Sequence, residues 1–218
     1  AIGIALCIGV LLGVISALYV NTWLDRLISV VSTFGMSIPS FFSAILFAWI
    51  FGYLLHRYTQ LPMTGSLYEV DDYGEGRYLA LRNIVLPALV LGIRPLSVVI
   101  QLMRNSLLEV LSLDYIRTAK AKGMSTTQVI YKHALKNALN PVVTALSGWF
   151  ASMLAGAVFV EYIFGWNGLG KEIVEALNTL DLPIIMGAVL TIATAFVIVT
   201  ILVDLIYAYL DPRIKLNE

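Results

Sequence analysis

Charged residues are scarce in this chain, and cysteine is almost absent. Only 13% of the 218 residues are Asp, Glu, Lys or Arg, whereas about 25% is usual in a soluble domain. The 14 basic and 14 acidic residues balance to a net charge of zero, so no overall positive charge favours nucleic acid as a partner. A single cysteine, Cys7, excludes an internal disulfide and a multi-cysteine metal site, and we expect it to be a small core residue.

Patterns of catalysis and nucleotide binding are also missing from the sequence. No glycine loop followed by Lys and Ser or Thr is present to cradle the phosphates of ATP. No group of His, Cys and acidic residues has the spacing of a metal site, and no nucleophile stands beside a base. We therefore expect no catalytic residue, no metal and no cofactor bound by this chain.

Apolar sequence dominates instead. The hydrophobic fraction is 59% and the mean hydropathy is +0.86. Five runs are long enough to cross a hydrocarbon core of about 30 Å as helices. These runs cover residues 1–20, 27–55, 84–111, 138–160 and 182–203. The sequence predicts an all-α membrane protein, a polytopic bundle of transmembrane helices forming one domain over residues 1–218.

Small residues and proline mark the surfaces and breaks of these helices. Gly9 and Gly13 have GxxxG spacing, which suits close helix packing, although chance explains one such pair equally well. Pro39, shortly after Gly35, predicts a kink or a broken helix between residues 35 and 40. Three small residues that recur every four positions are a stronger packing signal, and they are candidates for the pathway or a subunit interface: Gly148, Ser152 and Gly156.

Two arginines interrupt the third apolar run. A cation near the middle of a bilayer costs at least about 2.5 kcal/mol, so Arg94 should face the bundle interior, a partner subunit or water. We expect Arg94 to line the pathway or the subunit interface, with plain structural stabilisation as the alternative. Arg104 lies near the end of the run, where snorkelling of its side chain to the membrane surface is the expected explanation.

The charges between the runs predict their orientation. The polar loop at residues 112–137 carries five basic residues and one acid, so it should lie in the cytoplasm. The acidic loops at 56–83 and 161–183 should be external, and the basic tail after Asp204 should be internal. Ala1 then begins outside, so we interpret the chain as a fragment that lacks a sixth span at its N-terminal end.

The polar loop has the pattern helix, turn, helix. Ser112 or Asp114 is expected to cap a helix over residues 115–122, and Gly123 to take a left-handed conformation after it. Ser125 and Gln128 form a capping box, which predicts a second helix that ends near residues 140–141. On that helix, an exposed face in contact with solvent or lipid phosphate is expected from Gln128, Lys132 and Lys136.

The polar loop resembles the cytoplasmic EAA loop of the permeases of binding-protein-dependent ABC importers. Residues 117–123 and 133–138 carry the motif in the form found in the dipeptide/oligopeptide branch. Arg117 and Thr118 occupy its first two positions, and Lys136 stands where Pro is usual. The approach to the loop, residues 104–111, resembles the first (B-type) of the two permease subunits. Further resemblance comes from residues 161–164, 168–170 and 204–214.

This resemblance implies a type I importer fold and a set of partners. The partners would be a second, homologous permease as a heterodimer, two ATPase subunits that hold ATP and Mg²⁺, an external solute-binding protein and the bilayer of a prokaryotic cell membrane. The helix of the EAA loop would be a coupling helix that rests in a groove of the ATPase. The coupling residues implied are Tyr115, Ile116, Arg117, Thr118, Ala119, Lys120, Ala121, Lys122 and Gly123.

Other functions are weighed against this one. The resemblance implies a permease that translocates dipeptides or oligopeptides delivered by the solute-binding protein. Because the same branch also imports nickel or oligosaccharides, these two substrates are the alternative. A secondary transporter or ion channel would need membrane-embedded acids to bind a coupling ion, and the embedded charges recognised in the sequence are Arg94 and the flanking Arg104, Glu109 and Asp204. That is a poor site for a proton or sodium ion.

Overall fold

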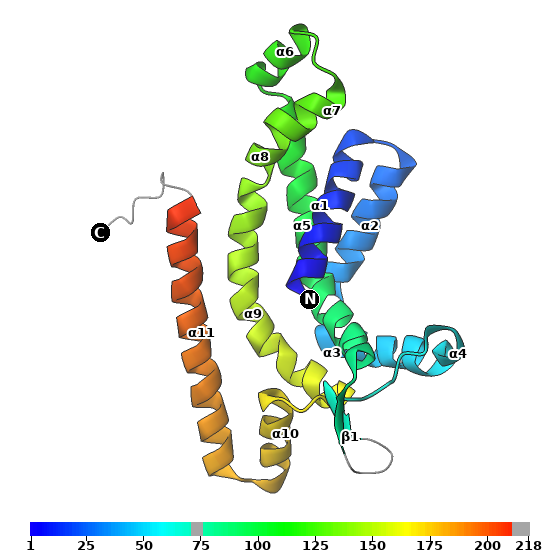
Figure 1. Cartoon of the computed structure of the whole chain (residues 1–218), viewed down its shortest axis with the longest axis vertical. Coiled ribbons are helices and arrows are strands. Elements are labelled where there is room, and N and C mark those ends of the chain that lie inside the picture. The colour runs from blue at the N-terminus through cyan, green and yellow to red at the C-terminus, as the bar shows by residue number, and fades with distance from the viewer. Residues whose placement is uncertain (71–75, 211–218) are drawn as a thin grey trace. The chain divides into compact units, whose positions relative to one another are not determined.

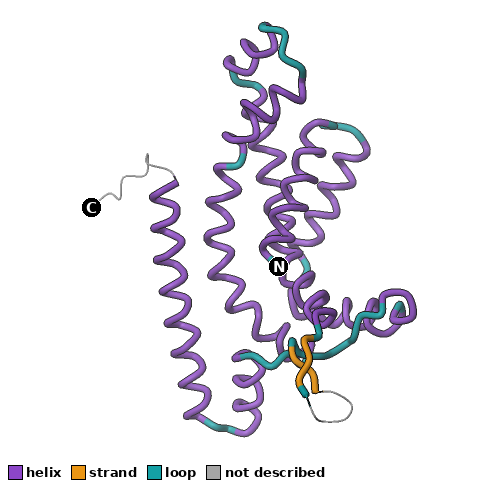
Figure 2. The backbone as a smooth tube through the Cα atoms, in the orientation of Figure 1, coloured by secondary structure: helices purple, strands orange, loops and turns teal. Residues whose placement is uncertain are grey.

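The computed structural model describes residues 1–70 and 76–210, most of which are helical (Figure 1 and Figure 2). The described residues form two compact units. The first, which we call the helical unit, comprises residues 2–37 and 93–149. The second, the hairpin unit, comprises Ala1 and residues 38–92 and 150–210. Two long helices, α5 (Val85–Leu111) and α9 (Asn140–Phe164), contribute to both units.

The helical unit packs α1 (Ile2–Leu18) and α2 (Trp23–Ser37) beside α5. From the end of α5 the chain continues through α6 (Asp114–Ala121), α7 (Thr126–Val129), a π-helical turn η3 (Ile130–Ala134) and α8 (Leu135–Ala138). One hydrophobic core joins α1, α5 and the elements that follow α5. It includes the fully buried side chains of Met103, Leu107, Ile116, Val129 and Val142.

Gly9 and Gly13 allow α1 to lie directly against α5. A Cβ atom at Gly9 would come within 2.6 Å of Val99 Cγ1, and one at Gly13 within 2.6 Å of Met103 Cβ. Both glycines are buried. The GxxxG spacing is therefore a packing surface within the chain, and close approach is what small residues provide between membrane helices.

The hairpin unit begins with α3 (Ser40–Phe47), the π-helical segment η1 (Ala48–Leu54) and α4 (His56–Thr59). Strands β1 (Tyr68–Val70) and β2 (Arg77–Leu79) pair antiparallel, with Glu69 opposite Tyr78, and a 3₁₀ turn η2 (Leu81–Ile84) leads into α5. The unit ends with α10 (Leu169–Thr179), which packs against α11 (Leu182–Leu210). Its hydrophobic core is built from Ala44, Ala48, Leu86, Val90, Val160 and Phe164.

Helices occupy all five predicted apolar runs, which confirms the predicted helical class. In the described part of the chain, two helical segments are long and apolar enough to cross a membrane, residues 81–111 and 182–202. A third is present if α2 and the helix that follows Pro39 count as one bent span. With 17 residues, α1 is shorter. The count of five spans, with a sixth upstream, stays a prediction.

Several local predictions are confirmed and others are wrong. The break near Pro39 is present, because α2 ends at Ser37 and α3 begins at Ser40. Cys7 is exposed on α1 and is not a core residue. The loop at residues 56–83 contains a helical turn and a two-stranded hairpin, whose tip, including Asp71, Asp72 and Glu75, lies outside the described residues.

Candidate functional site: the polar loop and the ion pair beside it

Helix α6 presents one apolar and one basic face. Ile116 and Ala119 are buried against the core of the helical unit, whereas Arg117, Lys120 and Lys122 are exposed. The i, i+3 spacing of the two buried residues places them on the same side of the helix. Burial of Ile116 contributes about 1.5–3 kcal/mol to holding this short helix in place. The basic side chains remain at the surface.

The start of α6 differs from the prediction. Leu113, and neither Ser112 nor Asp114, occupies the N-cap position, and it makes no side-chain cap. The Ser112 hydroxyl instead donates to the carbonyl of Glu109 at 2.7 Å, at the end of α5. Asp114 lies in the first helical turn, where the positive end of the helix dipole stabilises its carboxylate. Its Oδ1 lies 3.4 Å from Arg117 Nη1.

The turn after α6 matches the prediction closely. Gly123 has φ +82°, and a Cβ atom placed on it would meet nothing within 4 Å. Ser125 and Gln128 form both hydrogen bonds of a capping box, with N–O distances of 3.4 and 3.2 Å. Glycine is thus favoured at this turn by backbone conformation and not by lack of space.

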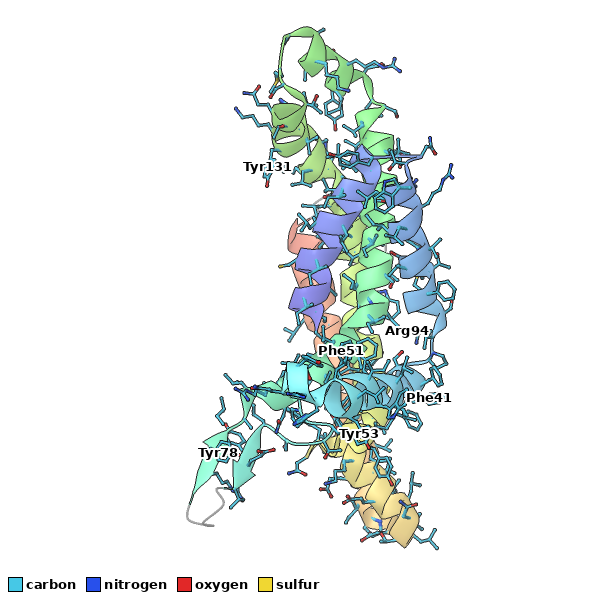
Figure 3. All side chains as sticks on the ribbon, turned by 90° about the vertical axis from the view of Figure 1, so that its right-hand side faces the viewer. Phe41, Phe51, Tyr53, Tyr78, Arg94 and Tyr131 are labelled. Atoms are coloured by element: carbon cyan, nitrogen blue, oxygen red, sulfur yellow. The ribbon has the colours of Figure 1, made fainter. Side chains whose placement is uncertain are left out.

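The predicted second helix is not a regular α-helix. Its middle, residues 130–134, is a π-helical turn. The helix is interrupted again at Leu139, and α9 begins at Asn140. Pro141 lies in the first turn of α9, where a missing N–H leaves no bond unmade. Tyr131 projects outward from the π turn and is 74% exposed (Figure 3).

Tyr115 ties α6 to this second segment. Its hydroxyl accepts a hydrogen bond from Asn137 Nδ2 at 2.8 Å and donates a long one to the carbonyl of His133 at 3.5 Å. The loop is therefore a folded element in which α6 is held by a buried apolar face and by a polar link to residues 133–137. Lys132 and Lys136 are exposed on that segment.

An ion pair that the sequence did not predict lies in the helical unit, on helices that precede this loop. Arg104 on α5 donates from Nε and Nη2 to the two carboxylate oxygens of Asp25 on α2, at 2.7 and 2.8 Å. The Ser16 hydroxyl on α1 and the backbone N–H of Asn21 also donate to Asp25, at 2.6 and 2.9 Å. The Asp25 side chain is 5% exposed. One carboxylate thus joins three helices.

The snorkelling predicted for Arg104 is therefore wrong. Its guanidinium turns toward a neighbouring helix because a bidentate carboxylate partner is available there. The sequence held a signal for this pair. Asp25 and Arg104 carry opposite charges, and the predicted orientation puts both at the cytoplasmic ends of their runs. Asp25 falls between the predicted runs 1–20 and 27–55, but in the structure it lies in the first turn of α2.

The predicted pathway residues are only partly placed. Arg94 is exposed on α5, and its guanidinium carbon lies 5.8 Å from the centre of the Trp149 ring on α9, both within the helical unit (Figure 3). This is cation–π geometry. Gly148 is exposed, and a Cβ there would meet nothing within 4 Å. Ser152 and Gly156 lie on α9, and their surroundings fall outside the described side chains.

A second carboxylate organises the turn between α9 and α10 in the hairpin unit. Glu161 accepts a hydrogen bond from the N–H of Gly170 at 2.7 Å. Glycine at 168 and 170 permits this, because a Cβ at Gly168 would lie 2.5 Å from Glu161 Oε2 and one at Gly170 would lie 2.4 Å from Val158 Cα. Asp181 accepts from the N–H of Ile184 at 3.3 Å and so caps α11.

Metal ligation has no candidate in the part of the chain that the structure describes. Among the side chains that the structure describes, no three of His, Cys, Asp or Glu come close enough to hold an ion.

The sequence of this chain matches a family model and several known proteins. Residues 9–216 match the family model of the binding-protein-dependent transport system inner membrane component. The dipeptide transport system permease protein DppB of Alkalihalophilus pseudofirmus is 40% identical over 97% of this chain, which covers 67% of that protein. A putative peptide permease protein of Brucella suis biovar 1 is 42% identical over 99% of the chain and 66% of its own length.

DppB of Bacillus subtilis, a dipeptide transport system permease protein, is 41% identical over 100% of this chain and 66% of its own length. The chain thus spans about two thirds of the length of the curated relatives it matches.

Proposed function

The chain belongs to the binding-protein-dependent transport system inner membrane component family, a family of transport permeases, and we propose from this premise that it is a permease subunit of an ATP-driven peptide importer. A solute-binding protein would deliver di- or oligopeptides from outside, and a second permease would complete the pathway. Two ATPase subunits would hydrolyse ATP at the cytoplasmic face of a prokaryotic cell membrane. The peptide substrate is supported by relatives named as dipeptide permeases.

The observation that carries the coupling part of this proposal is the folded state of the polar loop. Helix α6 is anchored by Ile116 and Ala119, stopped by the left-handed Gly123, and linked to residues 133–137 through Tyr115. A rigid helix with an exposed basic face can transmit a displacement from a partner to the spans that flank it. We assign this role to residues 115–123.

The remaining alternatives have less support. Nickel or an oligosaccharide could be imported by the same architecture, but the three relatives named above carry peptide names. A secondary transporter would need an acid that binds a coupling ion, and Asp25 is the one buried acid among the side chains whose burial the structure describes. Its oxygens already accept from Arg104, Ser16 and Asn21, so it offers no open ion site.

Transport itself is the direct test of this function. The permease, its paired permease and the ATPase should be purified together and reconstituted in vesicles, and the binding protein should be added. We expect ATP-dependent uptake of a labelled dipeptide, and no uptake of nickel or of an oligosaccharide. Uptake of nickel or of an oligosaccharide in place of the dipeptide would show that peptides are not the substrate.

Orientation gives the first mutational prediction. In a Cys7→Ser background, which removes the exposed native thiol, single cysteines at Ser125 and Arg77 should react with a membrane-impermeant maleimide from opposite sides. Both positions are exposed, one in the polar loop and one on β2. The basic loop is expected to lie inside and the acidic hairpin outside. Labelling of both from one side of sealed vesicles would disprove the topology.

Gly123 gives the second prediction. Gly123→Val should lower peptide uptake while membrane insertion and permease pairing stay normal. A non-glycine residue at φ +82° costs about 1–2 kcal/mol, and β-branched Val costs more. That strain is enough to change the population of a docked helix by about 5–30-fold without unfolding the bundle.

Gly123→Asn is the matched control, because Asn tolerates the left-handed conformation and the added side chain meets open space. Uptake and ATPase stimulation by loaded binding protein should be measured in the same preparation. Uptake that is equal in the Val and wild-type proteins would show that the geometry of this turn does not transmit the movement.

A further inference from the structure

The hairpin unit contains a polar cavity that the proposed coupling role does not use. It has a volume of about 530 Å³ and lies between the end of α4, the hairpin and η2. This size is within the usual range of small-molecule sites, about 300–1,000 Å³. We call it the hairpin pocket. The polar and proline side chains that line it are Gln60, Pro62, Glu69, Tyr78, Arg82 and Asn83.

Glu69 brings a negative charge to the pocket that neutral groups hold in place. Asn83 Nδ2 donates to Glu69 Oε1 at 2.7 Å, and the Tyr78 hydroxyl donates to Glu69 Oε2 at 2.8 Å. Neither donor carries a charge. Within residues 1–70 and 76–210, Glu69 has no salt bridge, so its charge is oriented but not balanced by a cation.

Arg82 brings the opposite charge, and it too lacks an ionic partner in the described ranges. Its Nη1 donates to the amide oxygen of Gln60 at 3.3 Å, which is a neutral acceptor. The rest of its guanidinium fork is available to a carboxylate, the group that this fork binds best. The hairpin pocket therefore offers one anionic and one cationic group that do not satisfy each other.

Buried contacts hold Glu69 and the backbone next to Arg82 in place. Asn83, next to Arg82 in η2, is 7% exposed and uses its second amide hydrogen on the carbonyl of Ser66 at 2.8 Å. Gly65 lies so close that a Cβ there would be 2.4 Å from Asn83 Nδ2. Strand pairing sets Glu69 opposite Tyr78. Figure 3 shows Tyr78 on the hairpin. A preorganised site of this kind spends little binding energy on ordering itself.

We propose that the hairpin pocket binds a zwitterionic short peptide, with the peptide ammonium on Glu69 and the peptide carboxylate on Arg82. This inference rests on the proposed import of peptides, and it adds a site on the permease itself that recognises free termini. Both contacts are made to the peptide ends, so the site would accept many side chains. It would hold a peptide before the peptide enters the membrane pathway.

The test measures binding to the assembled importer without its binding protein. The probe is alanyl-alanine, observed by ligand NMR or calorimetry, together with its N-acetylated and its C-amidated forms. We expect Glu69→Gln and Arg82→Gln each to weaken alanyl-alanine binding by roughly tenfold, the size expected for the loss of one charge-assisted hydrogen bond. Arg77→Gln is the matched control, because Arg77 is exposed on β2 and does not line the pocket.

The modified peptides separate recognition from a structural effect. Acetylation should weaken binding to the wild-type protein but should cause no further loss in Glu69→Gln. Amidation should behave in the same way with Arg82→Gln. The proposal is overturned if alanyl-alanine does not bind, if all three variants bind it equally, or if a variant weakens all three ligands by one factor. It is also overturned if the variants impair only docking of the binding protein.

Dipeptide uptake by the same wild-type preparation distinguishes the two proposals. Uptake without binding to the importer that lacks its binding protein would disprove the peptide site in the hairpin pocket and leave the proposed import of peptides standing. Binding without uptake, with the binding protein and ATP present, would disprove the proposed import of peptides and support the pocket as a site for zwitterions.

Discussion

Asp25→Ala should destabilise the protein by about 3–5 kcal/mol, the largest loss that we expect from a single substitution in the helical unit. The substitution leaves the Arg104 guanidinium between helices without its carboxylate. An uncompensated buried charge is the main source of the destabilisation when one partner of such a pair is removed. It also removes the acceptor of the Ser16 hydroxyl and of the Asn21 N–H. The measurement is the thermal unfolding midpoint of the purified protein in detergent.

Two controls make this result specific. Asp114→Ala breaks the other Asp–Arg pair of the helical unit, whose side chains are 95% and 75% exposed, so it should cost no more than about 0.5 kcal/mol. The double variant Asp25→Leu with Arg104→Leu removes both charges and should recover much of the loss. Equal effects of Asp25→Ala and Asp114→Ala would show that the buried pair does not join the helices.

Gly13→Leu is expected to have the second-largest effect. A Cβ at Gly13 would lie 2.6 Å from Met103 Cβ and 2.8 Å from the backbone oxygen of Ile100, so α1 and α5 would have to move apart. Overpacking of this kind costs about 1–3 kcal/mol. Ser16, three residues further along α1, would be drawn away from Asp25, which adds to the loss.

Gly3→Leu is the matched control on the same helix. Gly3 is exposed, and a Cβ there would meet nothing within 4 Å. The unfolding midpoint should fall for Gly13→Leu and stay near that of the wild type for Gly3→Leu. A similar change in both variants would mean that the GxxxG glycines are not required for packing against α5.

Local chemistry explains which parts of the loop could be predicted from the sequence. The capping box at Ser125 and the left-handed Gly123 depend on residues within four positions of each other, and both are found as predicted. The predicted N-cap of α6 was wrong, because two polar candidates, Ser112 and Asp114, flank the residue that the chain places there. Ser112 bonds to the end of the preceding helix instead.

Contacts between distant residues explain what could not be predicted. Asp25 and Arg104 are 79 positions apart, and only the folded arrangement of three helices brings them together. The role of Glu161 likewise depends on the turn that brings Gly170 back toward α9. The strands at Tyr68–Val70 and Arg77–Leu79 have three residues each, which is too short for an alternating pattern to reveal them.

Contact between α6 and the ATPase is the central claim, and site-directed photo-crosslinking tests it most directly. In the Cys7→Ser background, a benzophenone probe would be attached to a cysteine at Lys120, on the exposed face of α6, or at Lys132, exposed on η3. We predict that the probe at position 120 forms a covalent product with the ATPase subunit and that the probe at 132 forms little. Equal products from both positions, or a product from 132 alone, would contradict the assignment of α6 as the coupling helix.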